Sequence, residues 1–340
     1  MAVYKPQLTV VQMVREAAKG TLIAATRKTA FESFKVTPID LLHRPNLVKG
    51  MYIANKGNEF AIKRGVEWAV SGPVLYDQFH SWLDMAVNGA VAAPTGAADP
   101  YTWTMTRNAT ADPALKSKTF EYFPTDGTVV TGFKFGYAMA TKLEISAAEN
   151  EPVMFSIEGF ARRLQVMATK TAALALPAIA IPPIALTKLY IDSTWATLGT
   201  TIVTGQLLGW KWTVETGEMP VYTADVRADL DFPLDEMNIE NAKVSAEILL
   251  LVTGSGQWAT EKTAAEAGTL RAVRLVADIG TTPARTLTLD ALMKHTPGSI
   301  LPDGEKDGLQ TITLRLEGAT DDTNFISAAV LNSIATWALS

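Results

Sequence analysis

Apolar and polar residues alternate along much of the chain, as they do in a β-strand with one buried and one exposed face. The longest alternating stretch covers residues 133–145, which is long for a strand of a globular protein. A turn is expected at residues 147–152, and the alternation resumes over residues 153–163. The sequence therefore predicts a long β-hairpin in this region.

The second half of the chain has a similar pattern. Residues 207–215 alternate, with Trp210 and Trp212 on the apolar face, and a turn is expected at Gly217. Residues 226–232 predict the next strand. Further strands are predicted at residues 244–252, 273–279, 287–293 and 312–316. We therefore expect a mainly β fold of the α+β type with few helices.

Helical spacing is confined to a few segments. Residues 73–87 begin with a proline and lead to Gly89, which predicts a helix. Its apolar stripe consists of Leu75, Phe79, Trp82 and Ala86. A second helix is predicted at residues 257–267. Residues 325–337 have apolar positions four apart, which fits a helix, although their β-branched residues leave a strand open.

Length and composition indicate how the chain is organised. Its 340 residues are 48% hydrophobic and 19% charged, which is typical of globular protein and enough for two domains. Residues 171–186 are rich in Ala and Pro and almost uncharged, as in a semi-rigid linker. We expect an extended arm at residues 1–45, with a short helix near residues 10–19. Two domains follow, at residues 46–170 and 187–340, on either side of the linker.

A short match connects the two halves. Residues 130–137 and 203–210 share the pattern V-T-G-x-x-x-G-aromatic, and each copy opens a long alternating strand. The match suggests an internal duplication.

Charge and cysteine content narrow the possible functions. The chain has no cysteine, which excludes disulfide scaffolds, thiol nucleophiles and thiolate metal sites. Residues 1–170 hold 19 Lys and Arg against 15 Asp and Glu, and residues 171–340 hold 11 against 20. The halves therefore carry +4 and −9, which suits head-to-tail self-association, although unequal solvation of two domains also explains it. No run is apolar enough for a membrane helix, and no signal-peptide pattern begins the chain, so we expect folding in the cytoplasm.

No catalytic constellation is evident. The three histidines lack a metal-ligand spacing: His43, His80 and His295. No phosphate-binding glycine motif is present. The carboxylates Asp225, Asp229 and Asp231 share the polar side of one predicted strand, and a solvated face is their simplest interpretation. An acidic face of this kind could also line a passage for DNA, because like charges keep the polymer from adhering. We expect no cofactor, no metal and no enzymatic activity.

The layout resembles the major tail tube proteins of long-tailed bacteriophages, in the form with two tandem tube domains. The stretches that carry the resemblance in the first half are D-L-L-H-R-P-N-L at residues 40–47, R-G-V-E-W-A-V at 64–70, P-Y-T-W-T-M-T-R at 100–107, K-T-F-E-Y at 118–122 and the hairpin at 133–163. In the second half they are K-L-Y-I-D-S-T-W-A-T-L-G-T-T-I-V-T-G at residues 188–205 and the strand at 207–215.

The resemblance implies two β-sandwich domains, each with a flanking helix, that contribute long strands to a barrel shared between subunits. Rings of subunits stack into a hollow tube, and a two-domain chain needs three copies for a pseudo-hexameric ring. The candidate inner-barrel residues are Phe133, Phe135, Tyr137, Val153, Phe155, Trp210 and Trp212. The candidate acidic lumen or solvent face consists of Asp225, Asp229 and Asp231.

The implied function is a structural one, a conduit in the virion through which DNA is delivered. Implied partners are further copies of the chain, a tape measure protein, a tail terminator, tail-tip proteins and DNA in non-specific passage, with no membrane. One alternative is another β-rich virion module, such as a tail-tip, baseplate or decoration protein. A second alternative is a carbohydrate-binding or hydrolytic β-sandwich, with Asp229 and Asp231 or Glu149 and Glu151 as its carboxylates.

Overall fold

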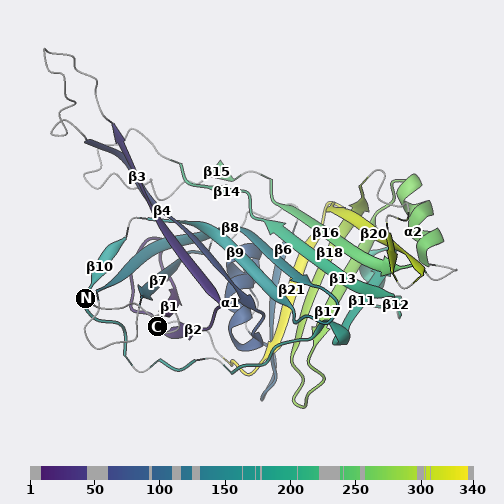
Figure 1. The fold of residues 1–340 in the computed structure, drawn as a ribbon, viewed down its shortest axis with the longest axis horizontal. Coiled ribbons are helices and arrows are strands. Elements are labelled where there is room, and N and C mark those ends of the chain that lie inside the picture. The colour runs from purple at the N-terminus through teal and green to yellow at the C-terminus, as the bar shows by residue number, and fades with distance from the viewer. Residues whose placement is uncertain are drawn as a thin grey trace, which may run out of the picture.

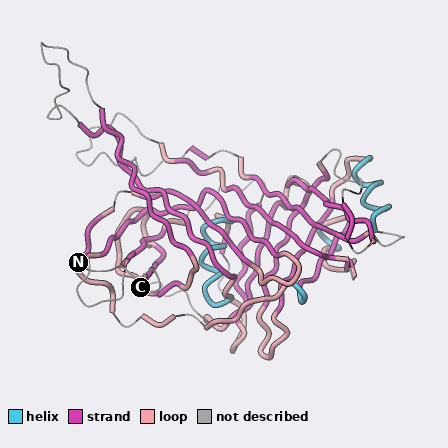
Figure 2. The backbone as a smooth tube through the Cα atoms, in the orientation of Figure 1, coloured by secondary structure: helices cyan, strands magenta, loops and turns pink. Residues whose placement is uncertain are grey.

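The computed structural model describes residues 9–43, 60–91, 94–108, 116–124, 131–162, 164–172, 174–176, 178–204, 206–221, 238–239, 241–252, 257–296, 302, 304–306 and 308–335. These residues form a mainly β structure with two α-helices (Figure 1). Figure 2 shows that strands make up most of the backbone, with one helix enclosed by strands and the other at the periphery. The mainly β fold expected from the alternation is confirmed.

The first half of the chain contains ten strands and one helix among the described residues. They are β1 (Val10–Arg15), β2 (Arg27–Thr29), β3 (Ser33–His43), β4 (Phe60–Pro73), α1 (Tyr76–Val87), β5 (Ala90–Val91), β6 (Tyr101–Asn108), β7 (Lys118–Phe123), β8 (Gly132–Ala147), β9 (Met154–Ala161) and β10 (Gln165–Met167).

The second half begins after a short 3-10 turn at Ile184–Leu186 and contains a second helix. Its elements are β11 (Thr187–Asp192), β12 (Ile202–Val203), β13 (Leu207–Glu215), β14 (Glu218–Met219), β15 (Asn238–Ile239), β16 (Lys243–Leu251), α2 (Gln257–Glu266), β17 (Arg271–Asp278), β18 (Thr286–His295), β19 (Gly304–Lys306), β20 (Leu309–Gly318) and β21 (Asn324–Asn332).

The two halves pair their strands in the same order. In the first half the order is β2-β1-β7-β8-β9-β4-β3, and all of these pairs are antiparallel. In the second half it is β12-β11-β17-β18-β20-β16-β13, again antiparallel. A helix follows β4 in one half and β16 in the other. We call β1 to β10 repeat A and β11 to β21 repeat B.

Two pairings join the repeats. Strand β8 of repeat A pairs with β13 of repeat B, and β6 of repeat A pairs with β21 of repeat B. Strand β13 ends the order in repeat B as β3 does in repeat A. It pairs with residues 142–147 of β8, beyond the part of β8 that pairs with β7. The sheet therefore runs continuously through both repeats.

The hydrophobic core is centred on α1. All twelve residues of α1 are buried, and the helix contacts β6, β8, β13 and β21. Beneath it, Phe120 stacks on Trp82 with ring centroids 6.0 Å apart and lies 5.2 Å from the ring of Trp68. Large aromatic rings bury much apolar area at little cost in conformational entropy, so this cluster is a major source of stability.

Most of the strands expected from alternation are confirmed. The long hairpin is β8–β9, with Leu143 opposite Ile157. The strand expected at residues 207–215 is β13, and the later ones correspond to β16, β17, β18 and β20. The helix expected at residues 257–267 is α2. The strand expected at residues 226–232 lies outside the described residues.

The short helix expected near residues 10–19 is wrong. The open choice at residues 325–337 is decided in favour of a strand, and the helix expected at residues 73–87 is confirmed over residues 76–87. Residues 10–15 of the expected short helix form β1, which is buried along almost its whole length and so shows no alternation. Residues 324–332 form β21 because Ile326, Ala328 and Val330 are buried with period two, and a spacing of four fits both periods. Helix α1 begins after Pro73, which ends β4, and stops at Asn88 in the left-handed conformation (φ 50°).

The structure also corrects the N-terminal arm and the alignment of the duplication. Strands β1, β2 and β3 within the expected arm belong to the sheet, because β1 pairs with β2 and β7 and β3 pairs with β4. The eight-residue match aligns β8 with β13, whereas these strands are neighbours. By strand order, the counterpart of β8 is β18 and the counterpart of β13 is β3.

Apart from the 3-10 turn at Ile184–Leu186, the described part of the expected linker follows the surface without regular structure. Its start is held by a hydrogen bond from the Thr171 amide to Glu121, and its end by one from the Val153 amide to the carbonyl of Pro182. Leu176 and Ile179 are exposed by 56% and 78%. The division of the chain into two tube domains remains a prediction.

Candidate assembly interface

The junction between β8 and β13 is built from two strands with opposite faces of different character. Its register runs from Trp210 opposite Ala147 to Glu215 opposite Lys142. On one face Trp210, Trp212 and Val214 are buried beside Leu143 and Ile145. Adjacent apolar pairs in a continuous sheet are the main stabilising contacts of such a junction. The two repeats are thus joined by both backbone pairing and a shared core.

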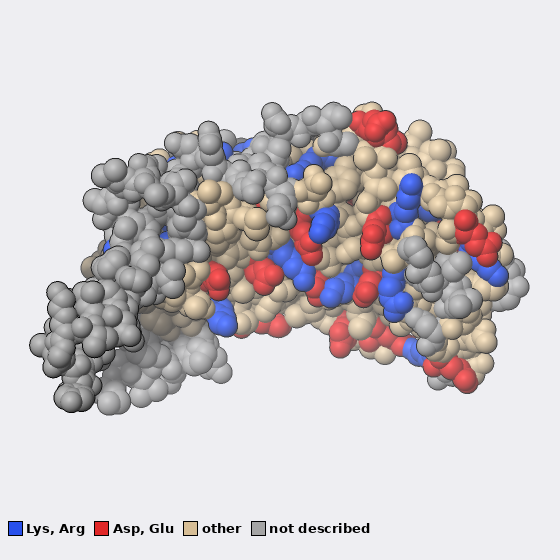
Figure 3. All heavy atoms as spheres, turned by 90° about the horizontal axis from the view of Figure 1, so that it is seen from above, with Lys and Arg blue, Asp and Glu red and all other residues tan. Residues whose placement is uncertain are grey.

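The other face of this sheet is mostly polar across four neighbouring strands, with Leu249 and Leu251 of β16 half-buried on it. We call it the charged face, and it consists of Lys142, Glu144, Ser146, Lys211, Thr213, Glu215, Lys243, Ser245, Glu247, Arg315 and Glu317. Figure 3 shows that positive and negative groups are interspersed on the side of the molecule that it presents. No aromatic side chain of the described residues of these strands is exposed on this face.

Opposite charges face each other from strand to strand on the charged face. Lys142 lies opposite Glu215, which lies opposite Lys243. In a second row Lys211 lies opposite Glu247, which lies opposite Arg315. Opposite charges placed directly across strands favour this register, each by a few tenths of a kcal/mol to about 1 kcal/mol.

An ion pair crosses the junction itself. Lys211 Nζ lies 2.9 Å from Glu144 Oε2, and Lys142 Nζ lies 3.6 Å from the same oxygen. These side chains are partly exposed, so solvent screens the attraction. The pair therefore selects the register of the two repeats more than it stabilises their association.

The structure buries most of the residues expected on an inner barrel. Six of the seven are less than 5% exposed: Phe135, Tyr137, Val153, Phe155, Trp210 and Trp212. Phe133 is partly buried and stacks on Tyr122. Trp212 and Phe155 both lie opposite Ile145, from the two sides of β8. Phe133, Phe135 and Tyr137 lie in the other half of that strand.

Six of these side chains therefore belong to the core of the chain, and their place in a barrel shared between subunits remains a prediction. The signal that could have identified the exposed face is in the same stretches, at the positions between the apolar ones, where Lys and Glu recur. Asp225, Asp229 and Asp231 lie outside the described residues.

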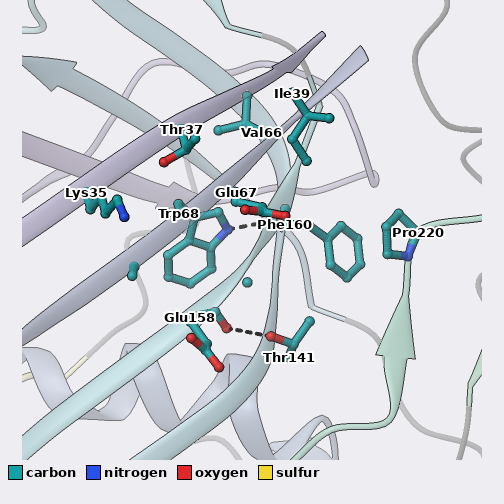
Figure 4. Close-up of a pocket in the computed structure, with 12 residues that line it drawn as sticks. Lys35, Thr37, Ile39, Val66, Glu67, Trp68, Thr141, Glu158, Phe160 and Pro220 are labelled. Atoms are coloured by element: carbon teal, nitrogen blue, oxygen red, sulfur yellow. Dashed lines mark hydrogen bonds between the residues drawn. The ribbon is translucent and has the colours of Figure 1, made fainter. Parts of the chain in front are cut away.

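A hollow of about 430 Å³ adjoins β3, β4 and β9 (Figure 4). Its rim carries the exposed residues Lys35, Thr37, Glu67 and Glu158, and Pro220 closes one side. Inside it, Trp68 Nε1 donates a hydrogen bond to the carbonyl of Phe160, 3.1 Å away. The two carboxylates are solvated at the rim, which is unlike the paired environments that general acid–base chemistry needs.

Several ionisable groups are buried in the core. Burial raises the pKa of Glu218 to about 8, with the charge of Arg107 opposing the shift, and Asn88 Nδ2 donates a hydrogen bond to Glu218 Oε1. Burial lowers the pKa of Lys118 to about 8, opposed by Asp84, whose Oδ2 is 3.8 Å from Lys118 Nζ. These groups fix neighbouring elements to each other and do not line the hollow described above.

Two histidines, His80 and His295, and the carboxylate Glu149 each contact other side chains of the chain. His80 is buried and its pKa lies well below the usual value, mainly because of burial. His295 Nε2 is 2.9 Å from Glu261 Oε2, and that carboxylate also accepts two hydrogen bonds from Arg271. His43 is in β3. Glu149 lies in the β8–β9 turn and forms an ion pair with Lys306.

Known proteins provide no further guide. No protein-family model matches the sequence, and no curated protein matches it. Among the described residues, no cluster of three or more His, Asp or Glu side chains is arranged to hold a metal ion. Within the same part of the chain, no helix is long and apolar enough to cross a membrane.

Proposed function

We propose that this chain is a structural virion protein that polymerises as stacked rings into the hollow tail tube of a bacteriophage. The observation that supports the proposal is the repeated strand order, in which β13, the edge strand of repeat B, pairs with the end of β8 in repeat A. A unit that accepts another copy of itself on one edge can continue to do so. Such addition generates a closed ring when the rotation between units divides a full turn.

Ring closure also removes the unpaired edges of the sheet, which would otherwise promote aggregation. Each chain supplies two repeats, so three copies make a ring of six. In this arrangement the charged face is the surface offered to the lumen. A surface of mixed charges without exposed aromatic rings gives DNA no base-stacking platform, which suits passage without retention.

The function is then mechanical, and the chain needs no cofactor for it. The partners that the proposal requires are further copies, a tape measure protein within the tube, a terminator and tail-tip proteins at its ends, and DNA in transit. The site of action is the virion, after assembly in the host cytoplasm.

Negative-stain electron microscopy of the purified protein, with light scattering on the same sample, tests the proposal. Hollow rings or tubes with three-fold or six-fold end views are the expected result. Particles of monomer mass at every concentration would contradict self-assembly. Saturable binding to glycans by such monomers would favour the carbohydrate-binding alternative instead.

A further inference from the structure

Two strands lack, in the described part of the chain, a neighbour that their counterparts in the other repeat have. Strand β13 pairs with both β16 and β8, but its counterpart β3 pairs with β4 alone. Strand β8 likewise pairs with β9 and β13, whereas β19, which continues β18 along β20, pairs with β20 alone. Each free edge therefore lacks the neighbour that its counterpart in the other repeat possesses.

We propose that β19 of one copy pairs with β3 of a second copy of this chain, in the antiparallel manner of β8 with β13. The proposal rests on the proposed ring assembly and names the two edges that close it. The junction inside the chain is the template for the junction between chains, so a partner of any other kind is not needed.

The template also sets the register. The pair next to each hairpin turn fixes the alignment. In the β8–β9 hairpin this pair is Ser146 opposite Met154, and in the β19–β20 hairpin it is Lys306 opposite Leu309, so Lys306 corresponds to Ser146. Strand β3 begins four residues after β2 ends, and β13 begins four residues after β12 ends, so Thr37 corresponds to Lys211. Because Ser146 lies opposite Lys211, Lys306 of one copy lies opposite Thr37 of the next.

The two edges are accessible and chemically complementary. Lys35 and Thr37 of β3 and Glu305 of β19 are exposed, and Figure 1 shows β3 and β20 at opposite ends of the molecule. The half of the chain that contains β3 carries +4 and the half that contains β19 carries −9, which favours contact between unlike ends. Pro38, the one residue of β3 without an N–H donor, discourages pairing with arbitrary strands.

Engineered cysteines test the pairing directly, because the natural chain contains none. Two variants place thiols on the same face of the two edges. T37C/K306C tests the register given above, and K35C/K306C tests a register shifted by two residues. T37C/E305C places them on opposite faces and is the matched control. S146C/K211C lies across the junction inside the chain and reports that the oxidation works.

After mild oxidation of assembled protein, we expect at least one same-face variant to give disulfide-linked oligomers that a reductant dissolves. The opposite-face control is expected to give at least ten-fold less, and S146C/K211C is expected to stay monomeric in size. Equal cross-linking of same-face and opposite-face variants would overturn the proposal.

Hydrogen exchange of the natural chain provides a second measurement that needs no variant. Residues 36–41 should exchange at least ten-fold more slowly in rings than in free subunits. If rings are seen by electron microscopy but neither cross-linking nor slower exchange occurs, the edge assignment fails and the proposed function stands. If the natural chain forms no rings, the proposed function fails first.

Discussion

Repeats A and B share a strand order but differ in how their helices are covered. Every residue of α1 is buried, and two of the strands around it, β13 and β21, belong to repeat B. Helix α2 lies at the periphery (Figure 2), where Glu261 and Ala264 are buried between exposed positions. The helix of repeat A is thus enclosed in part by strands of repeat B. The described residues contain no third repeat that covers α2, and the surface of this helix is partly open.

We expect the largest difference in stability between the two helices when an aromatic ring is removed from each. W82A deletes a fully buried side chain of α1 and is expected to cost about 3–5 kcal/mol of unfolding free energy. W258A deletes a partly buried side chain of α2 and should cost about 1 kcal/mol. Urea unfolding followed by circular dichroism measures both. Equal costs in the two helices would show that α2 is as well enclosed as α1.

The buried ion pair of repeat B is the next largest effect. E261Q leaves the Arg271 guanidinium without its carboxylate and is expected to destabilise the chain by about 3 kcal/mol. The matched control is E144Q at the partly exposed pair on the charged face, where a cost below about 1 kcal/mol is expected. A smaller loss for E261Q than for E144Q would contradict the burial of this pair.

Glu218 makes the stability of the contact between the repeats depend on pH. It anchors the segment after β13 to Asn88 at the end of α1. Its pKa is raised to about 8 when folded, so the folded chain binds more protons than the unfolded chain between about pH 4.5 and pH 8. Stability should therefore fall as the pH rises through that window.

E218Q keeps a neutral group at this position and is expected to flatten that part of the stability profile. Wild type and variant should differ little at pH 5 and most at pH 8, as measured by thermal unfolding. A parallel pH dependence in both proteins would assign the slope to another group.

The smallest expected effect is at the charged face. K211A removes the ion pair across the junction of the two repeats and should cost no more than about 1 kcal/mol, less at high salt. Assembly should persist in this variant if backbone pairing and the buried tryptophans hold the junction. Loss of rings from K211A with unchanged folding would assign the interface to charge pairing instead.

The sequence predicted the elements of this fold better than their neighbours. Period-two alternation located β8, β9, β13 and the later strands, because those strands have one covered face. It could not locate β1, whose two faces are both covered, and it left β21 ambiguous because a spacing of four fits two periods. The pairing of β8 with β13 brings together residues more than sixty positions apart, and alternation identifies a face but not a partner.

The same limit explains the candidate residues. Choosing the apolar positions of the long strands selected Phe135, Tyr137, Trp210 and Trp212, which the structure buries. The exposed face lies on the intervening residues, such as Lys142 and Lys211, whose alternation of charge becomes visible only when strands from both repeats are placed side by side.

Native mass spectrometry of the assembled ring measures directly how many chains close it. If each repeat acts as one unit of a ring of six, the smallest closed species contains three chains of 36.6 kDa, a total of about 110 kDa. We expect that mass, without dimers as a stable end point. A stable ring of six chains, or a protein that remains monomeric at all concentrations, would contradict this expectation.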